Sequence, residues 1–210
     1  MNNIDVKVYF NFRSPYCYLA SKTMWSIVDD FNVNILWRPV GGWDLRSPPE
    51  RAKSKLPIAR QDMSRFARRL GIPVIPPPAD TEPTAAGAAS LYAQEQGVLR
   101  EYIVETMRIE WAEGQNIGEE SVLREVAKRL NLDADLVITA SKNPVYRSTL
   151  AANAAEASTD GAIGVPSFII GEEIFWGQDR IDFVLEKLTE LRAAKCLNKK
   201  GDVEVGRISG

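Results

Sequence analysis

Two short segments, far apart in the chain, carry the side chains best suited to chemistry. In residues 10–17 (FNFRSPYC), Ser14 follows an apolar strand and Pro15 occupies the first position of a helix. The unpaired N–H groups and the dipole at a helix start favour a negative charge, so a hydroxyl at Ser14 can donate to a thiolate there. The second segment, residues 164–168 (GVPSF), precedes another strand. In it Val165-Pro166 would present backbone N–H and C=O groups to an extended peptide, as one strand does beside another.

The elements around these segments predict how they meet. Alternation of apolar and polar residues predicts a strand at 4–10, and helical periodicity follows from residue 15 to about Asp30. A strand, a helix and a second strand at this spacing favour a right-handed crossover and a parallel pair. Further strands are expected at 33–38, 167–170 and 174–176. A last helix begins at Asp179 and is expected to bury Ile181, Phe183, Val184, Leu185, Leu188 and Leu191.

The middle of the chain is almost entirely helical in its periodicity. Residues 41–57 are rich in Gly, Pro and charge and are expected to form a loop. Helices are then expected at 58–70, 84–97, 99–113, 119–130, 133–141 and 144–158. The fold class is therefore α/β, a thioredoxin-like domain (βαβ…ββα) interrupted by an all-helical insertion. The expected parts are thioredoxin-like residues 1–45, the insertion 46–158, thioredoxin-like residues 159–197 and a polar tail 198–210.

Composition excludes several kinds of chemistry. None of the 210 residues is histidine, which excludes Ser-His-Asp and Cys-His catalysis. Because the two thiols, Cys17 and Cys196, are far apart in the chain, we expect neither a disulfide framework nor a metal site. A net charge of −2 gives no reason to expect nucleic acid, and no apolar run is long enough to span a membrane. Residues 1–5 lack the pattern of a signal peptide, so we expect a cytoplasmic protein.

Ser14 occupies the position where a thioredoxin-like redox site has its first cysteine. Without a thiol there, Cys17 cannot close the local disulfide, which argues against disulfide exchange and for an enzyme that takes its thiol from glutathione. Cys17 itself is expected to be a small buried residue, with a mixed disulfide to glutathione as the alternative. Cys196 lies near the polar tail and is expected to have no role.

Five blocks of sequence resemble 2-hydroxychromene-2-carboxylate isomerases, which are relatives of kappa-class glutathione transferases. The blocks are residues 10–20 (FNFRSPYCYLA), 38–39 (RP), 111–114 (WAEG), 164–168 (GVPSF) and 175–180 (FWGQDR). The resemblance implies a dimeric, glutathione-dependent isomerase of aromatic catabolism. Its reaction would be reversible addition of the glutathione thiolate to a conjugated carbon, rotation about the resulting single bond, and elimination.

The resemblance, together with the helix starts, suggests which residues would hold glutathione. Ser14 would be the catalytic residue, unless it only caps its helix. Val165 and Pro166 would contact the cysteine of glutathione, unless the proline is purely structural. Gln178 and Asp179 would hold the γ-glutamyl end, unless Asp179 is only a helix cap. Arg180 is expected to orient Asp179 or to face solvent.

Tyr16 and Lys55 are the candidate substrate contacts. Residues 46–69 carry an excess of Lys and Arg, and Lys55 could attract the substrate's carboxylate or the glycine end of glutathione, unless this is only a solvated helix face. Tyr16, Trp43 and Trp111 could wall a pocket for an aryl ring or belong to the core. Residues 46–53 (RSPPERAK) lack the Gly-Asn-x-x-Pro-like stretch usual in the family, which leaves the substrate open.

Three other functions remain open from the sequence. A kappa-like glutathione transferase would use the same site residues and keep the adduct. A thiol–disulfide oxidoreductase would use Cys17. A non-catalytic module would only bind glutathione or an extended peptide in the cleft.

Overall fold

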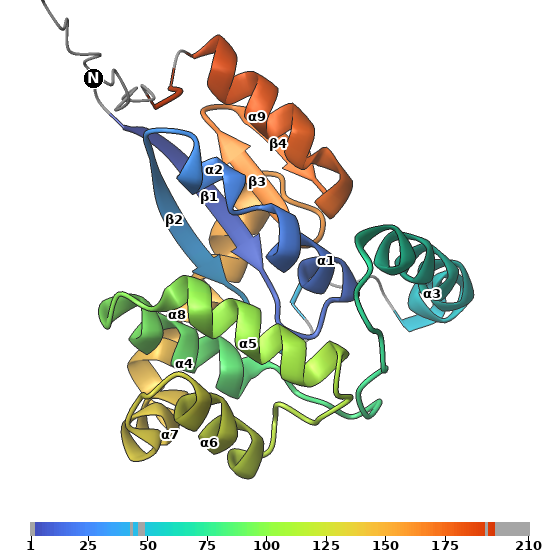
Figure 1. The fold of residues 1–210 in the computed structure, drawn as a ribbon, viewed down its shortest axis with the longest axis vertical. Coiled ribbons are helices and arrows are strands. Elements are labelled where there is room, and N and C mark those ends of the chain that lie inside the picture. The colour runs from blue at the N-terminus through green and yellow to red at the C-terminus, as the bar shows by residue number, and fades with distance from the viewer. Residues whose placement is uncertain (1–2, 43, 46–48, 192, 196–210) are drawn as a thin grey trace, which may run out of the picture.

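Four strands form one sheet in the computed structural model, which describes residues 3–42, 44–45, 49–191 and 193–195. They are β1 (Ile4–Phe10), β2 (Val33–Pro39), β3 (Ser167–Ile170) and β4 (Glu173–Trp176), in the order β2-β1-β3-β4 (Figure 1). β1 and β2 are parallel, whereas β3 is antiparallel to both β1 and β4. The predicted strands and the parallel pair are therefore confirmed.

The helix predicted from residue 15 to about Asp30 is two helices. α1 (Pro15–Thr23) ends at Met24, and α2 (Ser26–Asp29) follows after a turn. The Trp25 indole N–H donates to the carbonyl of Ser21 at 2.8 Å, which holds the turn together. The change of direction allows Ile27 to be buried in the core.

The helical insertion follows β2 and is largely as predicted. It consists of α3 (Pro49–Leu70), α4 (Thr84–Glu95), α5 (Leu99–Trp111), α6 (Glu120–Arg129), α7 (Ala134–Lys142) and α8 (Pro144–Thr159). The predicted loop at 41–57 is wrong from residue 49 onward, because α3 begins there and continues through Pro57. An internal proline removes one helical hydrogen bond, but the surrounding Ala, Arg, Lys and Leu residues are good helix formers. Residues 43 and 46–48 lie outside the described part of the chain.

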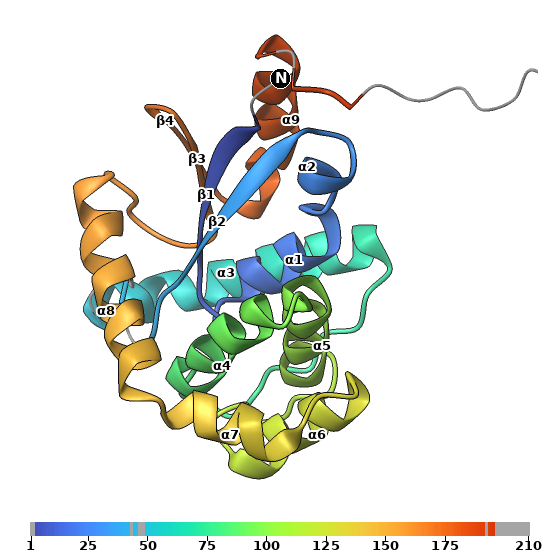
Figure 2. The same ribbon diagram turned by 90° about the vertical axis from the view of Figure 1, so that its left-hand side faces the viewer.

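Helices cover both faces of the sheet. Figure 2 shows α1, α2 and α9 (Ile181–Glu190) on one side of the strands and α8 on the other. Alternation along β1 explains this arrangement, because Val8 and Phe10 enter the main core while Tyr9 packs with Ala157 of α8. None of the helices in the described ranges is long and apolar enough to cross a membrane.

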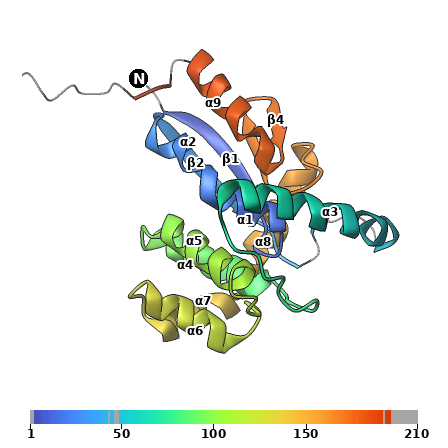
Figure 3. The same cartoon turned by 45° about the vertical axis from the view of Figure 1, so that its right-hand side comes forward.

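The insertion shares the main core with the sheet. Phe12, which follows β1, makes edge-to-face contacts with Trp37 of β2 and Tyr102 of α5, with ring centroids 6.5 and 5.9 Å apart. All three rings are buried. α3 contacts α1 and extends beyond it, away from the sheet (Figure 3). The insertion is therefore packed directly against the start of α1, where Ser14 lies.

The last helix buries a narrower face than predicted. A short 3₁₀ turn, η1 (Gln178–Arg180), precedes α9, whose residues Ile181, Val184 and Leu188 are buried. Phe183 and Leu191 were expected on the same face, but they are 51% and 43% exposed. At 100° per residue Phe183 points away from Ile181, so it cannot share that face.

Candidate functional site

Ser14 is held at the start of α1 by the turn that follows β1. Asn11 is buried, and its backbone carbonyl accepts a hydrogen bond from the Ser14 N–H at 3.1 Å. Its side-chain oxygen accepts from the Arg13 N–H at 2.8 Å, and its amide donates to the carbonyl of Val40 at 3.2 Å. The Ser14 hydroxyl caps α1 by accepting from the Cys17 N–H at 3.4 Å. The role of Asn11 was not predicted, although a polar residue at the end of an apolar strand is a signal for it.

The loop before β3 meets Ser14, as predicted. The Ser14 hydroxyl donates to the carbonyl of Val165 at 3.4 Å, and the Val165–Pro166 peptide bond is cis. The Gly177 N–H donates to the Pro166 carbonyl at 2.9 Å, which ties this loop to η1. The Val165 N–H donates to no group in the part of the chain that the structure describes. This N–H is therefore open to an extended peptide beside Ser14.

Asp179, the predicted contact for the γ-glutamyl end, lies on η1, which contacts α1. An ion pair joins its Oδ2 to Nη1 of Arg180 at 2.7 Å. Gly177 has φ +118°, and a Cβ there would lie 2.5 Å from Asp179 Oδ1, so the position requires glycine. The residue that caps α9 is Arg180, without a side-chain hydrogen bond, so the alternative that Asp179 only caps this helix is wrong. The preceding Gln178 is buried.

Tyr16, at the start of α1, lies within the electrostatic influence of acidic residues on two neighbouring elements. Burial raises the pKa of its phenol, and the negative charges of Asp62 on α3 and Asp179 on η1 raise it further. Its ring is partly buried against the main core. At neutral pH Tyr16 is therefore a neutral hydroxyl that can donate a hydrogen bond.

Comparison with known proteins agrees with this geometry. The family profile of the DSBA-like thioredoxin domain matches residues 5–189. The chain belongs to the DSBA-like thioredoxin family. The fold predicted from the sequence is therefore confirmed, including its helical insertion.

Proteins similar to this chain include the isomerases that the sequence resembles. The 2-hydroxychromene-2-carboxylate isomerase of Sphingobium xenophagum is 25% identical over 186 residues, which are 85% of this chain and 95% of that protein. A solved 2-hydroxychromene-2-carboxylate isomerase has a TM-score of 0.77 at 23% identity and covers 90% of this chain and 96% of its own. The cytosolic disulfide reductase DsbM of Pseudomonas aeruginosa, solved with GSH, has a TM-score of 0.66 at 19% identity over 90% of this chain and all of its own.

Cys17 is the thiol that the oxidoreductase alternative would use, yet it is fully buried. Burial raises its pKa to about 12, although hydrogen bonds to Asn11 and Ser14 oppose the shift. Since the thiolate is the reactive form, Cys17 is a poor nucleophile at neutral pH. This agrees with the expectation of a small buried residue. Cys196 lies outside the described residues.

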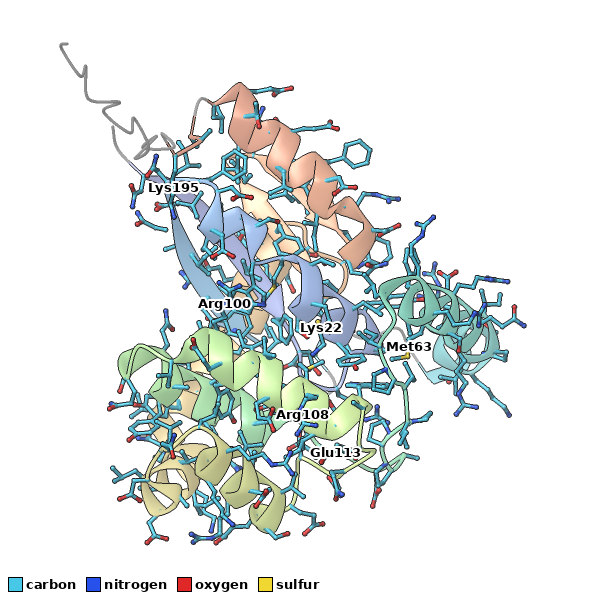
Figure 4. The ribbon with its side chains drawn as sticks, viewed as in Figure 1. Lys22, Met63, Arg100, Arg108, Glu113 and Lys195 are labelled. Atoms are coloured by element: carbon cyan, nitrogen blue, oxygen red, sulfur yellow. The ribbon has the colours of Figure 1, made fainter. Side chains whose placement is uncertain are left out.

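The predicted substrate contacts lie on several different elements. Lys55 lies in the exposed first half of α3, whereas Met63 in the second half is buried where α3 faces α1 (Figure 4). Trp111 is buried at the end of α5, and Trp43 lies outside the described residues. The role of Lys55 as a substrate contact stays a prediction.

The residues gathered here fit an organic thiol. In the described ranges, no three His, Cys, Asp or Glu side chains lie close enough to hold a metal ion. The open N–H of Val165 can pair with a peptide, and Asp179 can pair with an ammonium group. Ser14 can donate to a thiolate from the start of α1. These groups correspond in chemistry to the cysteine backbone, the ammonium and the thiol of a γ-glutamyl-cysteinyl peptide.

Proposed function

We propose that this protein is a glutathione-dependent isomerase that acts on 2-hydroxychromene-2-carboxylate or a similar intermediate of aromatic catabolism. The observation that carries the proposal is the Ser14 hydroxyl, which lies at the start of α1 and 3.4 Å from the carbonyl of Val165. A hydroxyl there can stabilise an external thiolate without competing as a redox partner. The relatives named as isomerases support the same reaction class.

The cysteine backbone, the γ-glutamyl ammonium and the sulfur of glutathione would each have a matching group in the site. The backbone of Val165 would pair with the cysteine residue, beside Pro166. Asp179 would accept from the γ-glutamyl ammonium, with Gln178 alongside, and Arg180 would keep the carboxylate oriented. The sulfur would then lie at Ser14, where the helix start favours the ionised form.

Bound glutathione would supply a nucleophilic thiolate for reversible addition to a conjugated carbon. The protein's own residues would then stabilise that thiolate and orient the ring. Tyr16, as a neutral donor, and Lys55, as a cation, are the proposed substrate contacts. The proposal includes a homodimer that works in the cytoplasm.

The first experiment is a calorimetric titration with reduced glutathione and, separately, with S-methylglutathione. We expect micromolar to low-millimolar binding of the free thiol and weaker binding of the methylated form, because the methyl group prevents ionisation at Ser14. An assay with 2-hydroxychromene-2-carboxylate follows, together with 1-chloro-2,4-dinitrobenzene. Failure to bind either glutathione or S-methylglutathione would exclude the isomerase. Conjugation of the chlorobenzene without turnover of the chromene would favour a kappa-like transferase.

The second candidate function is thiol–disulfide exchange. Likeness to a cytosolic disulfide reductase of the same fold favours it. The buried Cys17 and the serine at position 14 oppose it. The wild-type protein should therefore fail to reduce insulin with glutathione present, and Ser14→Cys should gain this activity. Insulin reduction by the wild type would favour the oxidoreductase.

A further inference from the structure

Arg13, the residue immediately before Ser14, holds its guanidinium over an aromatic ring. The guanidinium carbon lies 5.5 Å from the centroid of the Trp111 ring. Nη2 donates to the carbonyl of Pro78 at 3.2 Å. Arg13 is partly buried between the start of α1, the end of α5 and the segment before α4. A cation is therefore held in one orientation by the residue that directly precedes Ser14 in the chain.

A second arginine that stacks on a tryptophan, Arg100, also has a carboxylate partner. Arg100 lies over Trp25, with its guanidinium carbon 4.9 Å from the ring centroid. Its Nη1 and Nη2 also donate to both carboxylate oxygens of Asp29, at 2.7 and 3.1 Å. Figure 4 shows Arg100 on α5, on the side toward α2. The guanidinium of Arg100 therefore already binds a carboxylate of the protein, that of Asp29.

Arg13 differs because it forms no ion pair with any residue in the described ranges. Burial lowers the pKa of its guanidinium, and the negative charges of Glu110 and Asp80 act against this effect. An arginine in a protein nevertheless stays protonated. The bond from Nη2 to the Pro78 carbonyl is the one hydrogen bond that the Arg13 side chain donates to residues in those ranges.

The Trp111 ring under Arg13 also carries a polar group that is unpaired among the described residues. The residue is only 6% exposed, and its indole N–H is buried without a hydrogen-bond partner in the described part of the chain. A buried donor left without a partner costs about 1–3 kcal/mol, so such groups usually have one. Here the donor belongs to the ring over which Arg13 lies.

We propose that Arg13, held over Trp111, is a specificity-determining residue that binds the carboxylate of the aromatic substrate brought to Ser14. This inference rests on the proposed function and assigns the substrate an anionic group. The planar guanidinium fork matches a carboxylate with two parallel hydrogen bonds. A neutral analogue would not pair with the guanidinium fork in this way, and the site would discriminate against it.

Glutathione also carries carboxylates, so the test must separate the two sources. Calorimetric titrations with trans-cinnamate, cinnamamide and glutathione would be made on the wild type and on Arg13→Leu, Arg13→Lys and Arg100→Leu. Arg13→Leu should weaken cinnamate binding roughly 10- to 100-fold, as expected for lost hydrogen bonds to a charged group. It should leave cinnamamide and glutathione binding unchanged. Arg100→Leu, which removes an equally stacked cation, should leave cinnamate binding unchanged.

The outcomes distinguish this inference from the proposed function. Failure of the wild type to bind cinnamate, or equal affinity in Arg13→Leu, would overturn the carboxylate site. Weaker glutathione binding with unchanged cinnamate binding would assign Arg13 to the cofactor and also overturn it. If Arg13→Leu does not fold, Arg13→Lys decides, because it keeps the charge without the fork and should bind cinnamate about tenfold more weakly. A chromene assay without turnover, alongside Arg13-dependent cinnamate binding, would reject the isomerase and keep the site.

Discussion

Replacing Ser14 with alanine separates the two roles available to this side chain. As a helix cap, the hydroxyl accepts from the Cys17 N–H at 3.4 Å, and it donates to the Val165 carbonyl at 3.4 Å. Both distances exceed the usual range, so the cap contributes at the low end, about 0.5 kcal/mol. As a donor to a thiolate, the same hydroxyl would lower the barrier by about 2.7–4 kcal/mol. The two roles therefore differ several-fold in free energy.

Ser14→Ala should therefore lower kcat by about 10²–10³ while the melting temperature falls only slightly. The assay is chromene turnover with saturating glutathione, supported by a pH titration of thiolate absorbance near 240 nm in the glutathione complex. The pKa of the bound thiol should rise in the variant, because the anion loses a donor. Ser14→Thr keeps the hydroxyl and serves as the control. A Ser14→Ala rate within threefold of wild type, with the same thiol pKa, would refute the catalytic role and leave Ser14 as a cap.

Three further predictions concern the glutathione contact, the buried thiol and acid stability. Asp179→Ala should weaken glutathione binding by roughly 1.5–3 kcal/mol, since an ammonium loses its carboxylate; unchanged calorimetric affinity would leave Asp179 only as the partner of Arg180. Cys17 should react with a thiol reagent only after unfolding, and Cys17→Ala should keep its activity; fast labelling of the native protein would contradict the burial. Burial raises the pKa of Asp160, but hydrogen bonds from Lys7 and Tyr9 outweigh it and hold the pKa below 3.8. The charged Asp160 therefore stabilises the folded state fully at pH values above the pKa of an ordinary aspartate. This contribution is lost as the pH falls through the lower pKa of folded Asp160. Lys7→Met should accordingly make the melting temperature depend less on pH in the acid range.

Local patterns were sufficient for most of the framework. Alternation in residues 4–10 requires a strand with one apolar face, and the structure has β1 at Ile4–Phe10. Ser14 and Pro15 start a helix through interactions within one turn, and α1 begins at Pro15 with Ser14 as its cap. The loop predicted at 41–57 was less reliable, because it treated proline as ending a helix, whereas α3 continues through Pro57.

Other features depend on contacts between residues distant in the chain. The sequence predicted that Cys17 is buried, but the elements that bury it and raise its pKa to about 12 follow only from the packing. The exposure of Phe183 depends on which side of α9 faces the sheet. Arg13 lies over Trp111 only because the insertion returns α5 to the start of α1. Short-range periodicity and capping thus set the elements and the place of Ser14, whereas the burial, the charge environment and the partner of each site residue come from long-range packing.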